Sequence, residues 1–210
     1  MKALLLGISF LFAAVMELSA KTAQVQGENI TIEVPDSWTL AKMDGSVFYA
    51  TAPDNVSAIT IKKFPNDQGK SITPSFVAGL KKGMTDQGPK MGGTLDVTAE
   101  KSLTMGGAPA YEVQTVLTLP AKKVQMQNYV VATHDVYYLF SLQTVDPTKN
   151  DELQGLANSF RFTVPPVLPD NSLNDFEAGE RGGRFIGYAL PLLVLAVIIK
   201  IIVRKSRRAA

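Results

Sequence analysis

The only histidine of the chain, His134, stands beside Asp135, and this pair is the first place to look for chemistry. A histidine held by an aspartate acts as a general base when a serine nucleophile completes the triad. The sequence has no G-x-S-x-G elbow to supply that serine, and the pair falls in the turn of a predicted hairpin. We therefore expect His134 to be structural or solvated.

Metal and thiol chemistry find little support elsewhere in the chain. The sequence contains no cysteine, which excludes a disulfide framework, a zinc-thiolate site and a thiol nucleophile together. Four methionines offer thioethers to copper but are spread over several predicted elements, so we expect them to fill the core: Met84, Met91, Met105 and Met126. No P-loop and no G-x-G-x-x-G fingerprint occurs. We expect no metal and no cofactor.

An enzyme built on carboxylates is the remaining catalytic alternative, with Asp36, Asp44 and Asp135 as its candidates. Such an enzyme needs carboxyl groups whose pKa values are perturbed by burial or by a close charge. The sequence indicates no such pair. We therefore assign no catalytic residue and expect a protein that is not an enzyme.

Three lysine pairs lie in separate predicted elements, at Lys62–Lys63, Lys81–Lys82 and Lys122–Lys123. Brought together by folding, they would meet an anionic partner or lipid headgroups. Ordinary solvated surfaces are the alternative interpretation. The basic surplus behind the net charge of +2 is local to the C-terminus, so no basic field over the whole domain favours a nucleic-acid partner.

The first 20 residues are typical of a secretory signal peptide. Lys2 supplies the positive start, residues 3–15 are almost continuously apolar, and a small residue, Ala20, marks the predicted cleavage site. Leu18 is poorly suited to the third position before that site. An uncleaved signal anchor therefore stays open as an alternative.

Residues 185–203 form a second apolar segment, which we predict to be a transmembrane helix in contact with the lipid bilayer. Its 19 residues suffice to cross a hydrocarbon core of about 30 Å at about 1.5 Å per residue. A basic tail, residues 204–210, follows it with four membrane-orienting charges: Arg204, Lys205, Arg207 and Arg208. Positive flanks stay in the cytoplasm, so we expect a single-pass protein of the inner or plasma membrane whose N-terminal domain is periplasmic or extracellular.

Glycines at positions 179, 183 and 187 recur every four residues up to the outer end of this span. Small residues at that spacing let two membrane helices approach closely. Gly179, Gly183 and Gly187 are therefore candidate helix-association residues, and a homodimer is one interpretation. A flexible glycine stalk accounts for Gly179 and Gly183 equally well.

Residues 21–164 read as one exported α+β domain, followed by a stalk rich in Pro, Gly and acidic residues at 165–184. Alternating apolar residues and turn signals predict a central antiparallel β-sheet flanked by helices. The expected strands cover residues 30–34, 46–51, 56–64, 95–104, 110–119, 122–133, 136–144 and 159–164. One helix is expected after Thr73-Pro74, with Phe76, Leu80 and Met84 on its buried face, and a second after Asp146-Pro147.

Several strings in this domain resemble the PsbP-like fold family. They are Ile32–Trp38, the turn Gly106–Glu112, the hairpin Tyr129–Leu142 and the closing Leu156–Phe162. The family includes an extrinsic protein of photosystem II, a Ran-binding nuclear import protein and many bacterial envelope proteins of unassigned function. The resemblance implies a non-enzymatic binding or assembly module, and it transfers no functional residue, because each string is a packing or turn signature.

The sequence as a whole therefore predicts a membrane-anchored, extracytoplasmic, non-enzymatic binding or assembly module. Its partner would be another protein of the cell envelope, which the residues do not identify. The alternative is a small-ligand or lipid-sensing domain that uses a pocket between the sheet and the helices.

Overall fold

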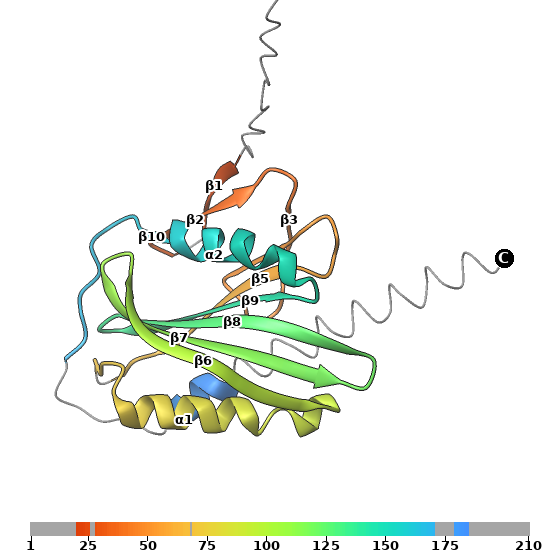
Figure 1. Cartoon of the computed structure of the whole chain (residues 1–210). Helices are drawn as coiled ribbons and strands as arrows, with labels where there is room; N and C mark the ends of the chain where they lie inside the picture. Colours follow the sequence, from red (N-terminus) through yellow and green to blue (C-terminus); the bar gives the residue numbers. More distant parts are fainter. Residues whose placement is uncertain (1–19, 26–27, 68, 171–178, 185–210) are drawn as a thin grey trace, which may run out of the picture.

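Two antiparallel β-sheets and the helices packed on them make up the part of the chain that this computed structural model describes, residues 20–25, 28–67, 69–170 and 179–184 (Figure 1). The larger sheet has seven strands and the smaller has three. This arrangement confirms the predicted α+β class and its antiparallel pairing.

The seven-stranded sheet has the strand order β3-β4-β5-β9-β8-β7-β6. Its strands are β3 (Thr39–Leu40), β4 (Phe48–Thr51), β5 (Ala58–Pro65), β6 (Thr94–Met105), β7 (Ala108–Leu119), β8 (Lys122–Ala132) and β9 (Val136–Thr144). Strands β6 to β9 form a meander, and its β6–β7 and β8–β9 turns lie at the predicted turn positions. At the β6–β7 turn, Gly106 and Gly107 both have positive φ, of 58° and 87°, which glycine adopts without steric cost.

The smaller sheet places β2 (Ile30–Pro35) between β1 (Ala20–Gln24) and β10 (Arg161–Phe162). Its outer strands come from opposite ends of the domain. Together with α2 (Asn150–Ser159), preceded by the short 3-10 turn Pro147–Lys149, it covers one face of the seven-stranded sheet, and α1 (Pro74–Thr85) lies on the other face (Figure 1).

The two covered faces give the domain two apolar layers. Toward α1, Phe64 and Phe76 pack on Tyr137, with ring centroids 4.8 and 5.0 Å from that of the tyrosine. Toward α2, the ring centroids of Phe140 and Phe160 lie 4.6 Å apart in an edge-to-face arrangement. Because both faces are covered, β9 is buried along almost its whole length and shows no polar alternation.

Three differences from the predicted elements concern short strands. The structure adds β1 and β3, and it reduces the final predicted strand, residues 159–164, to the two residues of β10. β1 begins at Ala20, the last residue assigned to the signal peptide, and Ala23 is its one buried residue, so the strand has no apolar alternation that would predict its pairing with β2. β3 has two exposed residues and therefore no periodicity.

The start of the predicted stalk lies against the domain. The backbone N–H of His134 donates to the carbonyl oxygen of Val167 at 2.8 Å, and that of Ser71 donates to the carbonyl oxygen of Asp170 at 3.0 Å. The backbone N–H of Asp170 in turn donates to the carbonyl oxygen of Gly69. Residues 165–170 thus run along the β8–β9 turn and the loop that precedes α1.

No helix among the described residues has both the length and the apolar character needed to cross a bilayer. The predicted span 185–203 and the tail with Arg204, Lys205, Arg207 and Arg208 lie outside the described residues, as does the predicted signal up to residue 19.

Candidate functional site

The His134–Asp135 pair lies in the β8–β9 turn, as predicted. His134 Nδ1 lies 2.7 Å from the Asp135 carboxylate, and both side chains are largely exposed, at 53% and 80%. The imidazole packs over Gly69, where an added Cβ would fall 2.7 Å from the ring. The ring therefore has a packing role against the loop that contains Gly69. Among the described residues, no serine is hydrogen-bonded to it.

The other carboxylates singled out in the sequence lie in different turns. Asp36 follows β2, Asp44 lies in the β3–β4 loop, and both are exposed. Within the described ranges, no group of three or more His, Cys, Asp or Glu side chains is placed to hold a metal ion. The methionines belong to the apolar layers: Met105 packs toward α2, and Met84 and Met126 pack toward α1, with the partly buried Met91 beside them.

The three lysine pairs stand on three different elements. Lys63 on β5 pairs with Glu28, and Lys81 and Lys82 on α1 have acidic partners of their own. Lys122 and Lys123 begin β8 and have no ion pair with any residue that the structure describes.

A groove between α1 and the sheet brings together charged and aromatic side chains from separate elements. It encloses about 390 Å³ and lies where the N-terminal half of α1 crosses β6 and β7. Thr73 caps the helix by accepting a hydrogen bond from the Phe76 N–H, and Pro74 occupies the first turn, as predicted. We call it the α1–β6 groove, and its principal lining residues are Ile72, Val77, Lys81, Glu100, Ser102 and Tyr111.

The polar side of the α1–β6 groove is a paired charge beside a phenol. Lys81 Nζ donates to Glu100 Oε1 at 3.0 Å, and each side chain is a little over one third exposed. Burial raises the pKa of Tyr111, and the charge of Glu100 and a hydrogen bond to it raise this pKa further. Tyr111 therefore keeps its proton at neutral pH. The groove offers a cation, an anion and a phenol next to an apolar wall, which suits recognition.

The edge of the seven-stranded sheet runs along this groove. Within the described part of the chain β6 pairs only with β7, so one side of its 12 residues has backbone N–H and C=O groups without a strand partner. A bulge between Val97 and Ala99 interrupts the register, which then continues without a break to Met105. Bulges and charged side chains limit indiscriminate pairing, and the stretch of unbroken register beyond the bulge leaves room for a matched segment.

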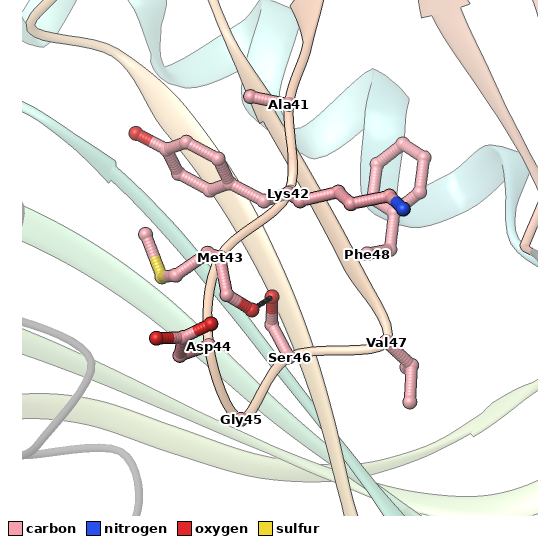
Figure 2. A pocket seen from close by; sticks show the side chains of 9 residues that line it. Ala41, Lys42, Met43, Asp44, Gly45, Ser46, Val47 and Phe48 are labelled. Carbon is pink, nitrogen blue, oxygen red and sulfur yellow. Dashed lines mark hydrogen bonds between the residues drawn. The ribbon is translucent and has the colours of Figure 1, made fainter.

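A second hollow lies in the β3–β4 loop and encloses about 420 Å³ (Figure 2). All of its lining belongs to residues 41–49, and the Ser46 hydroxyl closes the turn by donating to the Met43 carbonyl oxygen at 2.7 Å. Lys42 and Asp44 point to opposite sides of the loop (Figure 2). Because one short continuous segment, the loop and the start of β4, supplies every wall and its charges diverge, the α1–β6 groove is the stronger candidate site.

The sequence singled out Lys81 and, as an alternative, a pocket between the sheet and the helices, but it did not indicate which residues would line the groove. Lys81, Glu100 and Tyr111 are 19 and 11 residues apart along the chain, and they meet only because α1 packs across β6 and β7. Of the predicted helix-association residues, Gly179 and Gly183 lie against α1 of the same chain, and Gly187 lies outside the described residues. A homodimer through these glycines stays a prediction.

Comparison with known proteins finds no matching protein-family model and no match among curated proteins. Among solved structures, cyanobacterial PsbP (CyanoP) from Synechocystis sp. PCC 6803 is similar, with a TM-score of 0.58 at 12% identity over 71% of this chain and 95% of that chain. LpqN of Mycobacterium tuberculosis, involved in cell envelope biogenesis, gives a TM-score of 0.48 at 15% identity, over 70% of this chain and 91% of that chain. The similarity to CyanoP confirms the predicted PsbP-like fold.

Proposed function

We propose that this chain with a PsbP-like fold is a membrane-anchored, non-enzymatic binding module, which takes an extended segment of an envelope protein along the free edge of β6. The observation that carries the proposal is that edge itself, 12 residues long and bordered by the α1–β6 groove. A peptide added as a further strand gains backbone hydrogen bonds, and neighbouring pockets select its side chains.

The groove supplies that selectivity. The Lys81–Glu100 pair and the protonated Tyr111 hydroxyl can bond a polar side chain of the added strand, and Val77 and Ile72 offer apolar contact. The anchor is supported by the 19-residue apolar run and the basic tail that follows it.

Site-specific photo-crosslinking in the cells that make the protein tests the binding edge. A photoreactive residue replaces Ala99 on β6, and a matched control replaces Leu40, which is 47% exposed on β3 at the opposite edge of the sheet. We expect one protein partner to be captured from position 99 and not from position 40. Equal capture from both positions, or none from a folded protein at the membrane, would show that β6 is not the binding edge.

Topology is tested separately. Because the sequence contains no cysteine, a single introduced cysteine is the only thiol that a maleimide can label. We expect a cysteine placed at Asn55 to react with a membrane-impermeant maleimide on cells or spheroplasts with a sealed inner membrane. A cysteine at Ala209 should react only after lysis. The reverse pattern would refute the proposed orientation.

The size of the α1–β6 groove favours a second candidate, a small-ligand or lipid-sensing domain, because about 390 Å³ lies within the usual range for small-molecule sites. Mass spectrometry of the protein purified from native membranes distinguishes the two. A stoichiometric small molecule that is lost on Tyr111→Ala would favour the sensor, and a protein captured at β6 favours the binding module.

A further inference from the structure

Residues 179–184 form a helical turn that packs directly on α1, on the same side of the sheet (Figure 1). The contacts are made by glycines: a Cβ added at Gly179 would fall 1.8 Å from the Phe76 carbonyl oxygen, and one added at Gly183 would fall 2.0 Å from that of Leu80. The two backbones therefore touch, and an alanine at either position would force them apart.

Ion pairs also hold residues 179–184 against α1. Glu180 Oε1 accepts hydrogen bonds from Lys82 Nζ and from Arg184, each at 2.8 Å. Lys82 also pairs with Asp86 at the C-terminal end of α1. The segment is thus docked by backbone packing on one side and by a small charge network on the other.

The order of these contacts gives the direction of the docked segment. Gly179 lies beside Phe76, and Gly183 lies beside Leu80 and Met84, so the segment runs parallel to α1. Its last residue, Arg184, lies next to Gly83, near the C-terminal end of that helix. The predicted membrane span begins at the next residue, so the chain would enter the bilayer from that end of the domain.

The end of the domain next to the C-terminus of α1 carries several lysines without ion-pair partners among the described residues. The turn Pro89–Met91 follows α1 there, and Gly93 packs on the Thr118 carbonyl oxygen, which lies beside the β7–β8 turn. Three lysines at this end have no ion pair with any described residue: Lys90, Lys122 and Lys123. Of the acids at this end, Asp86 is paired with Lys82, and Asp96 of β6 is exposed.

We infer that this end of the domain, with Lys90, Lys122 and Lys123, docks on anionic lipid headgroups, so that the domain stands on the bilayer in one orientation. The inference rests on the proposed membrane anchor. Lysines near an anionic membrane surface attract its headgroups. The docked segment leads directly into the predicted span, so it keeps these three lysines close to the membrane surface. β6 begins at this end and extends away from the membrane, which leaves its free edge open to a partner in the envelope.

Spin labels on the full-length protein in lipid vesicles test the orientation. One label is attached to a cysteine at Ala121, in the β7–β8 turn, and a second to a cysteine at Thr104, close to the opposite end of β6. The two ends of a 12-residue strand are about 35 Å apart. A nickel chelate carried on lipid headgroups should relax the label at 121 several-fold more than the label at 104.

Charge variants test the role of the headgroups. In vesicles with anionic lipid, Lys122→Gln with Lys123→Gln should reduce the difference between the two labels, and so should purely neutral lipid. The matched control, Lys21→Gln with Lys42→Gln, removes the same charge from other parts of the domain and should change nothing.

The outcomes separate the inference from the proposal on which it rests. Equal relaxation at 121 and 104 would overturn the fixed orientation. A difference that persists in neutral lipid and in the Lys122/Lys123 variant would overturn headgroup binding. A chain that does not float with the vesicles would refute the membrane anchor itself, and a chain that floats with equal relaxation would refute only this inference.

Discussion

Gly83 of α1 and Gly183 of the segment that leads to the predicted membrane span are in direct backbone contact. A Cβ added at Gly83 would fall 3.0 Å from the Gly183 Cα and 2.2 Å from the Glu180 carbonyl oxygen. One added at Gly183 would fall 2.9 Å from the Gly83 Cα. Because neither helix has room for a side chain here, both positions require glycine if the segment is to remain docked.

Gly83→Ala should therefore release the docked segment. In an isolated helix this change is stabilising by about 0.5–1 kcal/mol, because alanine restricts the unfolded chain. Here the clash with backbone should reverse the sign and lower the free energy of unfolding by about 1–2 kcal/mol. Tryptic cleavage after Arg181 should also become faster. Urea unfolding of the protein in detergent, followed by the fluorescence of Trp38, measures the first effect.

Gly155→Ala on α2 is the matched control, since nothing lies within 4 Å of the added Cβ. It should stabilise the domain by about 0.5–1 kcal/mol and leave cleavage after Arg181 unchanged. If Gly83→Ala proves as stabilising as Gly155→Ala, residues 179–184 do not dock on α1 in solution.

The stability of the domain should fall in alkali because of buried tyrosines. Burial raises the pKa of Tyr138 to about 12 from its ordinary 10, and the charge of Glu28, which accepts the Tyr138 hydroxyl at 3.1 Å, adds to the effect. Burial and the charge of Glu112 likewise raise the pKa of Tyr129. Between about pH 10 and 12 the unfolded chain loses these protons and the folded chain keeps them, so folding becomes less favourable as the pH rises.

The expected loss is up to about 1.4 kcal/mol per pH unit for each such tyrosine. Urea unfolding at several pH values between 9 and 12 measures it. Tyr138→Phe should make the slope shallower, whereas Tyr49→Phe, at a half-buried position, should change it less. A slope that is the same with and without the Tyr138 hydroxyl would contradict the assignment.

A buried carboxylate on β7 should depend on its cross-strand lysine. The Glu112 side chain is 1% exposed, and its Oε2 lies 3.0 Å from Lys101 Nζ on β6. Gln114 donates to its Oε1 at 2.6 Å. Lys101→Met leaves the carboxylate without its cation, and because Lys101 is itself 61% exposed we expect a loss of only about 1–2 kcal/mol.

Adding Glu112→Gln to Lys101→Met should recover part of that loss, because the uncompensated charge is then gone. A double-mutant cycle in urea gives the coupling between the two residues. Independent, additive effects would show that water, and not Lys101, satisfies the carboxylate.

The α1–β6 groove should contribute to binding more than to stability. Lys81→Ala with Glu100→Ala removes a partly exposed ion pair, which typically contributes about 0–1 kcal/mol to folding. We expect the unfolding transition to shift little and capture of the partner from position 99 to drop several-fold. Unchanged capture would mean that the backbone edge of β6 acts without the groove.

Local patterns in the sequence were sufficient for most elements. Ile30, Ile32 and Val34 alternate because one face of β2 is buried, and all three are fully buried in the structure. Phe76, Leu80 and Met84 recur every four residues and form the buried face of α1. These features depend on side chains close in the sequence, so the period of the apolar residues reveals them.

The order of the amino acids was enough to predict the α+β class, the main strands and helices, the PsbP-like resemblance, and the apolar and basic segments on which the membrane prediction rests. Which residues meet became clear only from the folded chain. It brought Lys81 to Glu100 and Tyr111, left β6 at an edge, and packed Gly183 on Gly83. The physical reason is that periodicity reports which face of an element is buried, whereas contacts between elements distant in the chain depend on how those faces are stacked.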